Sequence, residues 1–235
     1  KAQEEVSLAE VEAALEPVAE QDEGIMSFQV EPISLEIGYG LIPIVDEGND
    51  DNLISHITSI RRQCASEMGI VVNPIRIRDN LQLGANDYLI KIKGNEIAKG
   101  ELYLNKYLVI DPGSDDFEIE GIATKEPAFG LDAIWVDEDK KDSIDLMGYT
   151  IVEPVTVLVT HLKEIIKSHS HDLLGRQEVQ LLLEGIKEKY NVVVDELIPD
   201  ILSLGEVQKV LQNLLKEDIA INDLVTILEI LADNG

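Results

Sequence analysis

The residue types that most often bind metals are sparse in this chain, and their spacing suits none of the usual sites. His169 and His171 are two positions apart, and on a helix such side chains point about 200° away from each other, so they cannot hold one ion. The acidic stretch 111–116 lacks the ligand spacing of a calcium loop. Cys64 falls on the apolar face of an expected helix, where a thiol is normally inert. The sequence therefore predicts no metal site.

Motifs for nucleotide and acyl chemistry are missing as well. The spacing G-x-x-x-x-G-K-[ST] of a phosphate-binding loop does not occur. Gly38-Tyr39-Gly40 has neither the third glycine nor the following helix of a dinucleotide site. No G-x-S-x-G element positions a nucleophilic serine. We therefore predict that the protein is not an enzyme, has no catalytic residues and needs no cofactor, with an acidic cytoplasmic enzyme as the alternative.

Composition narrows the possible partners. The 235 residues contain 19 Lys and Arg against 46 Asp and Glu, which gives a formal net charge of −27. Phosphate backbones and anionic lipid repel such a chain, so we expect no nucleic-acid partner. A single cysteine excludes an internal disulfide and fits a reducing compartment. No apolar run approaches the about 18 residues that a membrane span needs, so we expect a soluble cytoplasmic protein. The chain begins with Lys rather than Met, so we expect it to be a piece of a longer protein.

The first 31 residues differ from the rest and are predicted to form an acidic linker. They hold nine acidic residues and one lysine. Ser7 and Glu10 have the spacing of a capping box, and a narrow apolar stripe over 8–18 predicts a short helix. One such stripe cannot fold alone, so we expect the segment to be either disordered or docked on a partner surface.

From residue 33 onward, strand and helix patterns alternate. A helix is expected over 50–68, with Leu53, Ile57, Ile60 and Cys64 on its buried face and Gly69 as its stop. Gly94-Asn95 is predicted to form the turn of a hairpin. Alternation of apolar and polar residues predicts strands at 33–37, 70–78, 87–93 and 96–104.

Residues 107–153 form a shorter segment of mixed character. Strands are predicted at 107–110, 133–136 and 149–152, with a short helix over 139–146. Pro154 then opens a helix that should run to about Leu174. That helix has the apolar spacing of a core element of the preceding block, so the segment between them is predicted to be an insertion.

The remainder of the chain is predicted to be helical. Ser203 and Glu206 form a second capping box, and Asn222 is expected to cap the last helix. Strands followed by a run of helices indicate separate subdomains. The predicted fold class is α+β with several subdomains, in which an α+β base carries a small inserted α/β subdomain and is followed by a helical subdomain.

Six short blocks suggest a family when they are taken together in their order. They are Gly38–Pro43, Arg76–Asn80, Glu126–Leu131, Thr160–Leu162, Gly175–Glu178 and Leu211–Leu215. As an ordered set within residues 33–233, they closely resemble the cytoplasmic domain of the flagellar type III export-gate proteins of the FHIPEP family. A virulence injectisome gate protein of the same architecture is the alternative within this resemblance.

The resemblance implies a division into subdomains. Residues 1–31 correspond to the family's linker, and 32–106 together with 154–172 correspond to its first subdomain. Residues 107–153 resemble the second subdomain, which is inserted into the first, and 173–235 resemble most of the helical third. A fourth subdomain of the family has no counterpart in this sequence.

The resemblance also implies a function. Members of the family form a nonameric cytoplasmic ring at the inner membrane of bacteria, where they serve as docking platforms for export chaperones with bound substrates and contact other export-apparatus proteins, including the ATPase complex. The acidic, aromatic and threonine positions of the family's docking pocket correspond to Glu126, Phe129 and Thr160. Linker residues that contact a neighbouring subunit correspond to Asp22, Glu23 and Phe28.

The residues themselves are compatible with this expectation. Phe129 follows Pro127 and precedes Gly130, in a turn that can present an aromatic ring to an incoming apolar helix. Glu126 beside it would supply one directional charge. The alternative is that Phe129 is an ordinary core residue. Gly38 and Gly40 are predicted to be a hinge, because glycine tolerates backbone angles that other residues do not.

Overall fold

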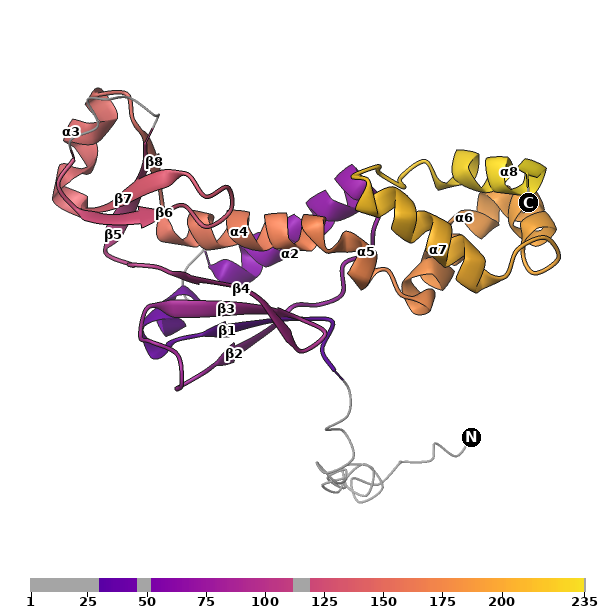
Figure 1. Ribbon diagram of the computed structural model, residues 1–235, viewed down its shortest axis with the longest axis horizontal. Helices are drawn as coiled ribbons and strands as arrows, with labels where there is room; N and C mark the ends of the chain where they lie inside the picture. Colours follow the sequence, from indigo (N-terminus) through magenta and orange to yellow (C-terminus); the bar gives the residue numbers. More distant parts are fainter. Residues whose placement is uncertain (1–29, 46–51, 112–118, 235) are drawn as a thin grey trace, which may run out of the picture. The chain divides into compact units, whose positions relative to one another are not determined.

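The computed structural model describes residues 30–45, 52–111 and 119–234 (Figure 1). Glu31–Gly235 forms one compact unit, which contains every helix and strand of the described residues. Nearly all of the predicted acidic linker, including its short helix and the contact residues Asp22, Glu23 and Phe28, lies outside the described residues, as does most of the predicted turn at 111–116.

The first sheet has four strands in the order β2-β1-β3-β4. They are β1 (Ile33–Ile37), β2 (Arg76–Asp79), β3 (Asp87–Ile92) and β4 (Asn95–Glu101). β1 pairs in parallel with β2 and antiparallel with β3, which forms the predicted hairpin with β4. The turn lies one residue earlier than expected, because Lys93 and Gly94 both have positive φ (49° and 79°) and Asn95 already pairs with Ile92.

The predicted strand at 70–78 forms only in its last part. Ile70 and Val72 are buried in the core without joining a sheet, and they lead from the helix α2 (Leu53–Met68) into β2. α2 confirms the predicted helix and its buried face. It begins where the Asn52 side chain accepts a hydrogen bond from the Ser55 N–H, and it ends at Gly69, whose φ of 77° is left-handed.

The second sheet has the order β6-β7-β5-β8 and is antiparallel throughout. Its strands are β5 (Lys106–Ile110), β6 (Ile122–Lys125), β7 (Asp132–Asp137) and β8 (Thr150–Val152). The strand β6 was not predicted, because it is a mostly exposed edge strand with no apolar alternation. The predicted helix at 139–146 consists of a short 3-10 turn, η3 (Glu138–Lys140), followed by α3 (Lys141–Leu146).

The two faces of the second sheet pack against different neighbours. Leu108 and Trp135 belong to the same apolar core as the first sheet, whereas Val109 and Val136 pack with Ile144 of α3. This alternation is what a strand with two covered faces requires, because successive side chains point to opposite sides.

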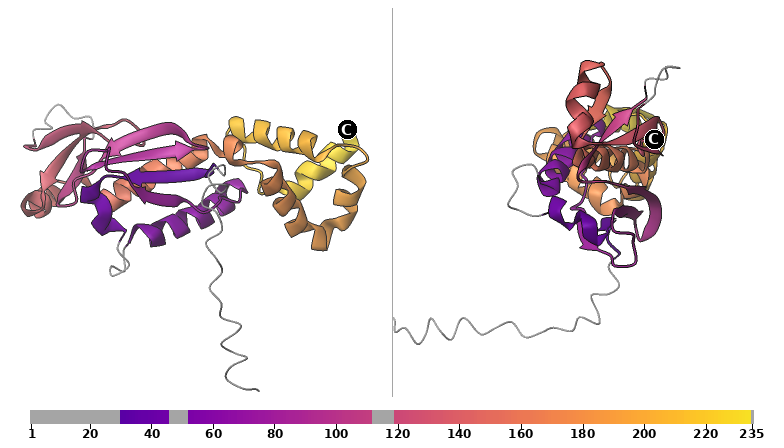
Figure 2. Two further views of the ribbon diagram at one scale, coloured as in Figure 1. Left: turned by 90° about the horizontal axis from the view of Figure 1, so that it is seen from below. Right: turned by 90° about the vertical axis from the view of Figure 1, so that its left-hand side faces the viewer.

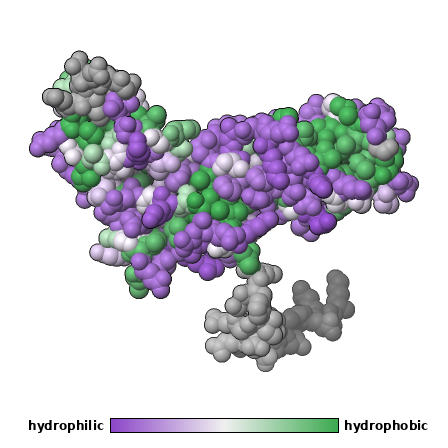
Figure 3. All heavy atoms as spheres, in the orientation of Figure 1, coloured by the Kyte–Doolittle hydropathy of each residue, from purple (hydrophilic) through white to green (hydrophobic). Residues whose placement is uncertain are grey.

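Five helices follow or flank the sheets. They are α4 (Pro154–Ser168), α5 (Ser170–Leu173), α6 (Arg176–Leu197), α7 (Leu204–Lys216) and α8 (Leu224–Asn234). α4 lies beside α2 and also contacts β4 of the first sheet and β5 of the second (Figures 1 and 2). Apolar residues are exposed on the terminal helices, notably Val192 and Ile230, and green spheres gather over α6 and α8 in Figure 3.

Two predicted features of the helices are wrong in detail. The helix expected from Pro154 to about Leu174 breaks at His169, whose backbone (φ −108°, ψ 17°) is not helical, so α4 and α5 are separate. Asn222 does not cap the last helix. Its amide donates to the Ser66 carbonyl of α2, and the neighbouring Asp223 carboxylate accepts from the Thr226 N–H instead. The capping box of Ser203 and Glu206 is confirmed.

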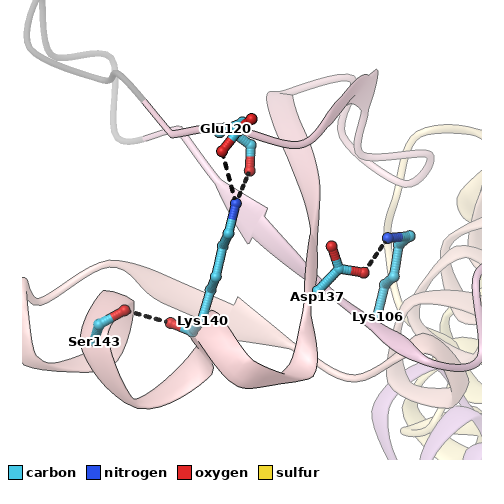
Figure 4. Close-up of polar contacts among 5 residues, drawn as sticks. All are labelled: Lys106, Glu120, Asp137, Lys140 and Ser143. Carbon is cyan, nitrogen blue, oxygen red and sulfur yellow. Dashed lines mark hydrogen bonds and ion pairs between the residues drawn. The ribbon is translucent and has the colours of Figure 1, made fainter.

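Polar contacts also link strands of the second sheet and the segments next to them (Figure 4). Lys106 and Asp137 face each other across β5 and β7 and form an ion pair, which lowers the pKa of Asp137. Lys140 forms an ion pair with Glu120 at 3.1 Å, and its carbonyl accepts a hydrogen bond from Ser143 in α3. All these pairs are exposed on at least one side, so each contributes little to stability.

Gly38 and Gly40 have a different reason to be glycine than the one predicted. Neither has a positive φ, and Gly38 is in ordinary extended backbone (φ −69°, ψ 160°). A Cβ at Gly38 would lie 2.0 Å from the Gly84 carbonyl oxygen, and one at Gly40 would lie 2.8 Å from that of Ala85. Close backbone approach, rather than an unusual backbone angle, therefore requires glycine here. A hinge at these residues stays a prediction.

This close approach predicts that Gly38→Ala destabilises the fold. The added methyl group must push the Gly84 backbone away. We therefore expect the unfolding free energy to fall by about 1–3 kcal/mol in a urea titration. Gly185→Ala is the control, because its Cβ meets nothing within 4 Å on an exposed position of α6, and it should stabilise by about 0.5–1 kcal/mol. Equal stability of both variants would contradict the packing argument.

Candidate functional site

The turn that joins β6 and β7 holds the predicted aromatic position. It spans residues 126–131, directly after the last strand pair, Lys125 with Asp132. Gly130 has a φ of 71°, which a side chain would disfavour. The Phe129 side chain is 62% exposed, so the alternative that it is a core residue is excluded. Ile122 and Leu131 on the same hairpin are exposed too.

Glu126 begins this turn and differs from expectation. It is only 4% exposed, and its two carboxylate oxygens accept hydrogen bonds from the backbone N–H groups of Ala128 (2.9 Å) and Phe129 (2.7 Å). We expected Glu126 to supply one directional charge beside Phe129, but the carboxylate is buried and bonded to these two amides. The carboxylate is used inside the turn because its side chain folds back over the next three residues.

A cleft of about 420 Å³ lies beside this turn, between the edge of the first sheet and the second sheet. One wall is β4, and the other is β6 with the turn that follows it. The strands β5 and β7 and the helix α4 contribute buried residues. The lining residues are Ala98, Lys99, Gly100, Glu101, Leu108, Thr124, Lys125, Glu126, Pro127, Gly130, Trp135 and His161. Pro127 and Gly130 line the cleft, whereas Phe129, which directly precedes Gly130, is not among the lining residues.

A buried polar pair lies next to the cleft. The Tyr88 hydroxyl of β3 is 2.7 Å from Nδ1 of His161 in α4, and the two rings meet edge to face with centroids 5.8 Å apart. Tyr88 reaches α4 because its strand partner is Gly100, where a Cβ would lie 2.4 Å from the hydroxyl oxygen. The pair therefore connects the first sheet to the helix that contacts both sheets.

Burial sets the charge state of this pair. It raises the pKa of Tyr88, and the negative charge of Glu126 raises it further. Burial lowers the pKa of His161, and the charge of Glu126 partly opposes that shift. Both groups are neutral at neutral pH, so a short hydrogen bond rather than an ion pair holds them together.

The structure brings together some of the predicted site residues. Glu126 and Phe129 share one turn. Thr160 is half-buried on α4, directly before His161, and is not among the cleft-lining residues. Sequence reasoning missed Tyr88 and His161 as a pair because they are far apart in the chain. A histidine among the apolar positions of α4 was the available signal.

Two searches of the described residues gave negative results. In residues 30–45, 52–111 and 119–234, no group of three or more His, Cys, Asp or Glu is arranged to hold a metal ion. Across the same ranges, no helix combines the length and apolar character needed to cross a bilayer.

Comparison with known proteins decides the family. The model of the FHIPEP family matches residues 1–235. The chain belongs to the FHIPEP family. It is 48% identical over 236 residues to the flagellar biosynthesis protein FlhA of Bacillus subtilis, an alignment that covers 100% of the chain and 35% of the relative. This FHIPEP chain therefore spans about a third of the length of that curated relative.

Solved structures show the same fold. The CdsV protein of Chlamydia pneumoniae, solved in complex with CdsO, is 26% identical and superposes with a TM-score of 0.76, covering 88% of this chain and 64% of that one. The nonameric EscV cytosolic domain from the type III secretion system is 21% identical with a TM-score of 0.63, over 86% of this chain and 58% of that one. The α+β architecture with two small sheets and a helical end agrees with the predicted fold class.

Removal of the Tyr88 hydroxyl should destabilise the protein. Tyr88→Phe leaves Nδ1 of His161 buried without a partner, which should cost about 1–3 kcal/mol of unfolding free energy in a urea titration. Tyr103→Phe is the matched control, because that hydroxyl bonds the exposed carboxylate of Glu101, and it should change stability by less than about 0.5 kcal/mol. A loss no larger than that of the control would contradict the role of the buried pair.

Stability should also depend on pH through His161. The pKa of His161 is lower in the folded chain than the ordinary value of 6.5. As pH falls below 6.5, the unfolded chain therefore binds more protons than the folded chain, and the folded state loses stability. We expect the urea midpoint to fall as pH decreases from 7.5 through 6.5 to 5.5, and to fall less in His161→Gln. An equal fall in both proteins would show that His161 does not cause the dependence.

Proposed function

We propose that this chain is a docking platform of the flagellar type III export gate, whose cleft binds export chaperones that carry their substrates. The observation that carries the proposal is the exposure of Phe129 in the turn whose Pro127 and Gly130 line the cleft between the two sheets. Membership of the FHIPEP family and the likeness to a flagellar biosynthesis protein support it.

The apolar area that a docked segment could cover lies mainly on the hairpin beside the cleft. Phe129, Ile122 and Leu131 are exposed there. Within the cleft, Leu108 and Trp135 are buried, and the exposed lining residues include Lys99, Glu101 and Lys125. An exposed aromatic beside a concave surface is the usual anchor of a protein interface, because it buries a large rigid area at a small entropic cost. Thr160 is proposed to contribute from α4, near His161.

Identity favours the flagellar branch over the injectisome alternative. The chain is 48% identical to the flagellar relative and 21% identical to the EscV domain of the type III secretion system. EscV is nonameric and CdsV is solved with CdsO, which supports our proposal that the full-length protein forms a ring and contacts other export-apparatus proteins, including the ATPase complex. We place this activity at the cytoplasmic face of the bacterial inner membrane.

The division into subdomains is part of the same proposal. The first sheet with α2 and α4 corresponds to residues 32–106 and 154–172, and the second sheet with α3 corresponds to residues 107–153. The helices α6–α8 correspond to residues 173–235.

The enzyme alternative is tested separately, since native mass spectrometry of the purified chain would reveal a bound nucleotide or metal.

Truncation of the exposed ring should weaken binding without unfolding the chain. We expect Phe129→Ala to lower the affinity for a purified flagellar chaperone–substrate complex by about 2 kcal/mol, or roughly 30-fold, in a calorimetric titration. The fold should survive, because Phe129 is 62% exposed.

Leu146→Ala provides the matched control. Leu146 is 89% exposed on α3, the helix that packs on the second sheet. Its truncation removes an apolar side chain that does not line the cleft, so it should leave the affinity unchanged. Wild-type affinity of Phe129→Ala, or an equal loss in both variants, would contradict the proposed docking site.

A further inference from the structure

We propose that His161 is a binding residue of the cleft: its Nε2–H group donates a hydrogen bond to an uncharged oxygen of the docked segment, such as a main-chain carbonyl. This inference rests on the proposed function, because it names a group that the docking cleft offers to its partner. The same ring also forms the buried hydrogen bond to Tyr88 through Nδ1, so its two nitrogens have different tasks.

The hydrogen bond to Tyr88 decides which ring nitrogen carries the proton. Burial lowers the pKa of His161, so the ring is neutral at neutral pH and has a single N–H. The Tyr88 hydroxyl is fully buried, 2.7 Å from Nδ1. If Nδ1 carried the proton, the hydroxyl hydrogen would lack an acceptor among the described residues, which is costly in a buried place. We therefore assign Nδ1 as the acceptor and Nε2 as the N–H donor.

The donor on Nε2 faces the cleft without a partner. Within the described ranges, no side chain or backbone group forms a hydrogen bond with this atom. It is not sealed in the core either, because Nδ1 of His171 is the one fully buried side-chain nitrogen or oxygen of the described residues that lacks a partner. His161 is 5% exposed and lines the cleft, so the small accessible part of its ring that includes Nε2 opens there.

An unpaired donor at this place makes the cleft selective. A docked segment excludes water from the cleft, and the Nε2–H group then needs an acceptor from that segment. A buried donor that loses water without gaining an acceptor costs affinity, so segments that supply an oxygen at this point are favoured over those that do not.

The charge next to His161 indicates the class of acceptor. Glu126 is a buried carboxylate in the lining of the cleft, and both of its oxygens are bonded to main-chain amides of its own turn. Its negative charge acts on His161. A carboxylate of the partner at Nε2 would be repelled by this charge, whereas an uncharged oxygen would not. Acidic groups of the partner are better placed beside the exposed lining residues Lys99 and Lys125.

Two substitutions separate the two ring nitrogens. His161→Asn puts an amide oxygen near the place of Nδ1, where it can accept from Tyr88, but it does not reach the place of Nε2. His161→Gln reaches the place of Nε2 with an amide N–H and leaves Tyr88 without its acceptor. We expect His161→Asn to weaken binding of a purified flagellar chaperone–substrate complex roughly tenfold in a calorimetric titration, and His161→Gln to weaken it by less than about threefold.

Stability should change in the opposite order. His161→Gln should lower the urea midpoint more than His161→Asn, because only His161→Gln breaks the hydrogen bond to Tyr88. His171→Asn is the matched control for binding, since it makes the same change at a histidine that does not line the cleft, and it should leave the affinity unchanged. If affinity instead follows stability, with His161→Gln the weaker binder, the binding role of Nε2 is overturned.

Two further measurements test the donor and its acceptor separately. Nitrogen NMR of the free chain at neutral pH should show a proton bonded to Nε2 of His161 and none on Nδ1, and the reverse result would overturn the donor. The loss of affinity in His161→Asn should be the same at low and at high salt, because salt does not screen a bond to an uncharged acceptor. A loss that shrinks with added salt would overturn the proposed class of acceptor.

The outcomes distinguish this inference from the proposed function. If the wild-type chain does not bind the chaperone–substrate complex, the proposed function fails, and the role of His161 in docking fails with it. If the wild-type chain binds and His161→Asn binds equally well, the docking platform stands and only the role of His161 is refuted.

Discussion

Trp135 lies in the same apolar core as the first sheet, and the position of the cleft depends on that packing. Its ring meets Tyr103 edge to face at 5.7 Å, and Leu108 on the neighbouring strand joins the same core. The opposite face of the second sheet is covered by α3 through Val136 and Ile144. A sheet covered on both faces cannot slide or rotate without exposing apolar area to water. The walls of the cleft are therefore held in a fixed relation.

The buried hydrogen bond between Tyr88 and His161 adds a directional contact to this apolar packing. Apolar contacts alone tolerate small shifts, whereas a hydrogen bond of 2.7 Å between two buried groups is satisfied in only one arrangement. Because α4 also contacts β5, the hydrogen bond that fixes α4 against the first sheet also affects the position of the second sheet. Within this arrangement, the turn that begins at Glu126 exposes Phe129 beside the cleft between the two sheets.

Sequence patterns predict those parts of the fold that local physics determines. Apolar spacing and a left-handed glycine stop are enough for α2, and the reciprocal bonds of Ser203 and Glu206 are enough for the start of α7. The exposed edge strand β6 has no apolar alternation to reveal it. The break at His169 is hidden because apolar residues continue through it, and Asn222 and Asp223 are adjacent caps of nearly equal propensity, which only the contact with α2 separates.

Family resemblance supplied residues for the candidate site, but the sequence could not supply their geometry. Glu126 and Phe129 were identified from family resemblance, yet the sequence cannot tell whether a glutamate points to solvent or folds back onto amides of its own turn. Tyr88 and His161 meet only after both sheets and α4 are assembled. Long-range contacts of this kind depend on the complete packing rather than on any local pattern.

A hydrogen-exchange footprint of a bound flagellar chaperone–substrate complex would show whether the cleft between the two sheets is the docking site. We expect added protection at 98–101 of β4 and at 124–130 around the turn, the two walls of the cleft, with little change over α6–α8. Protection confined to the helices α6–α8, with the cleft walls exchanging as in the free chain, would contradict the claim that the cleft is the docking site.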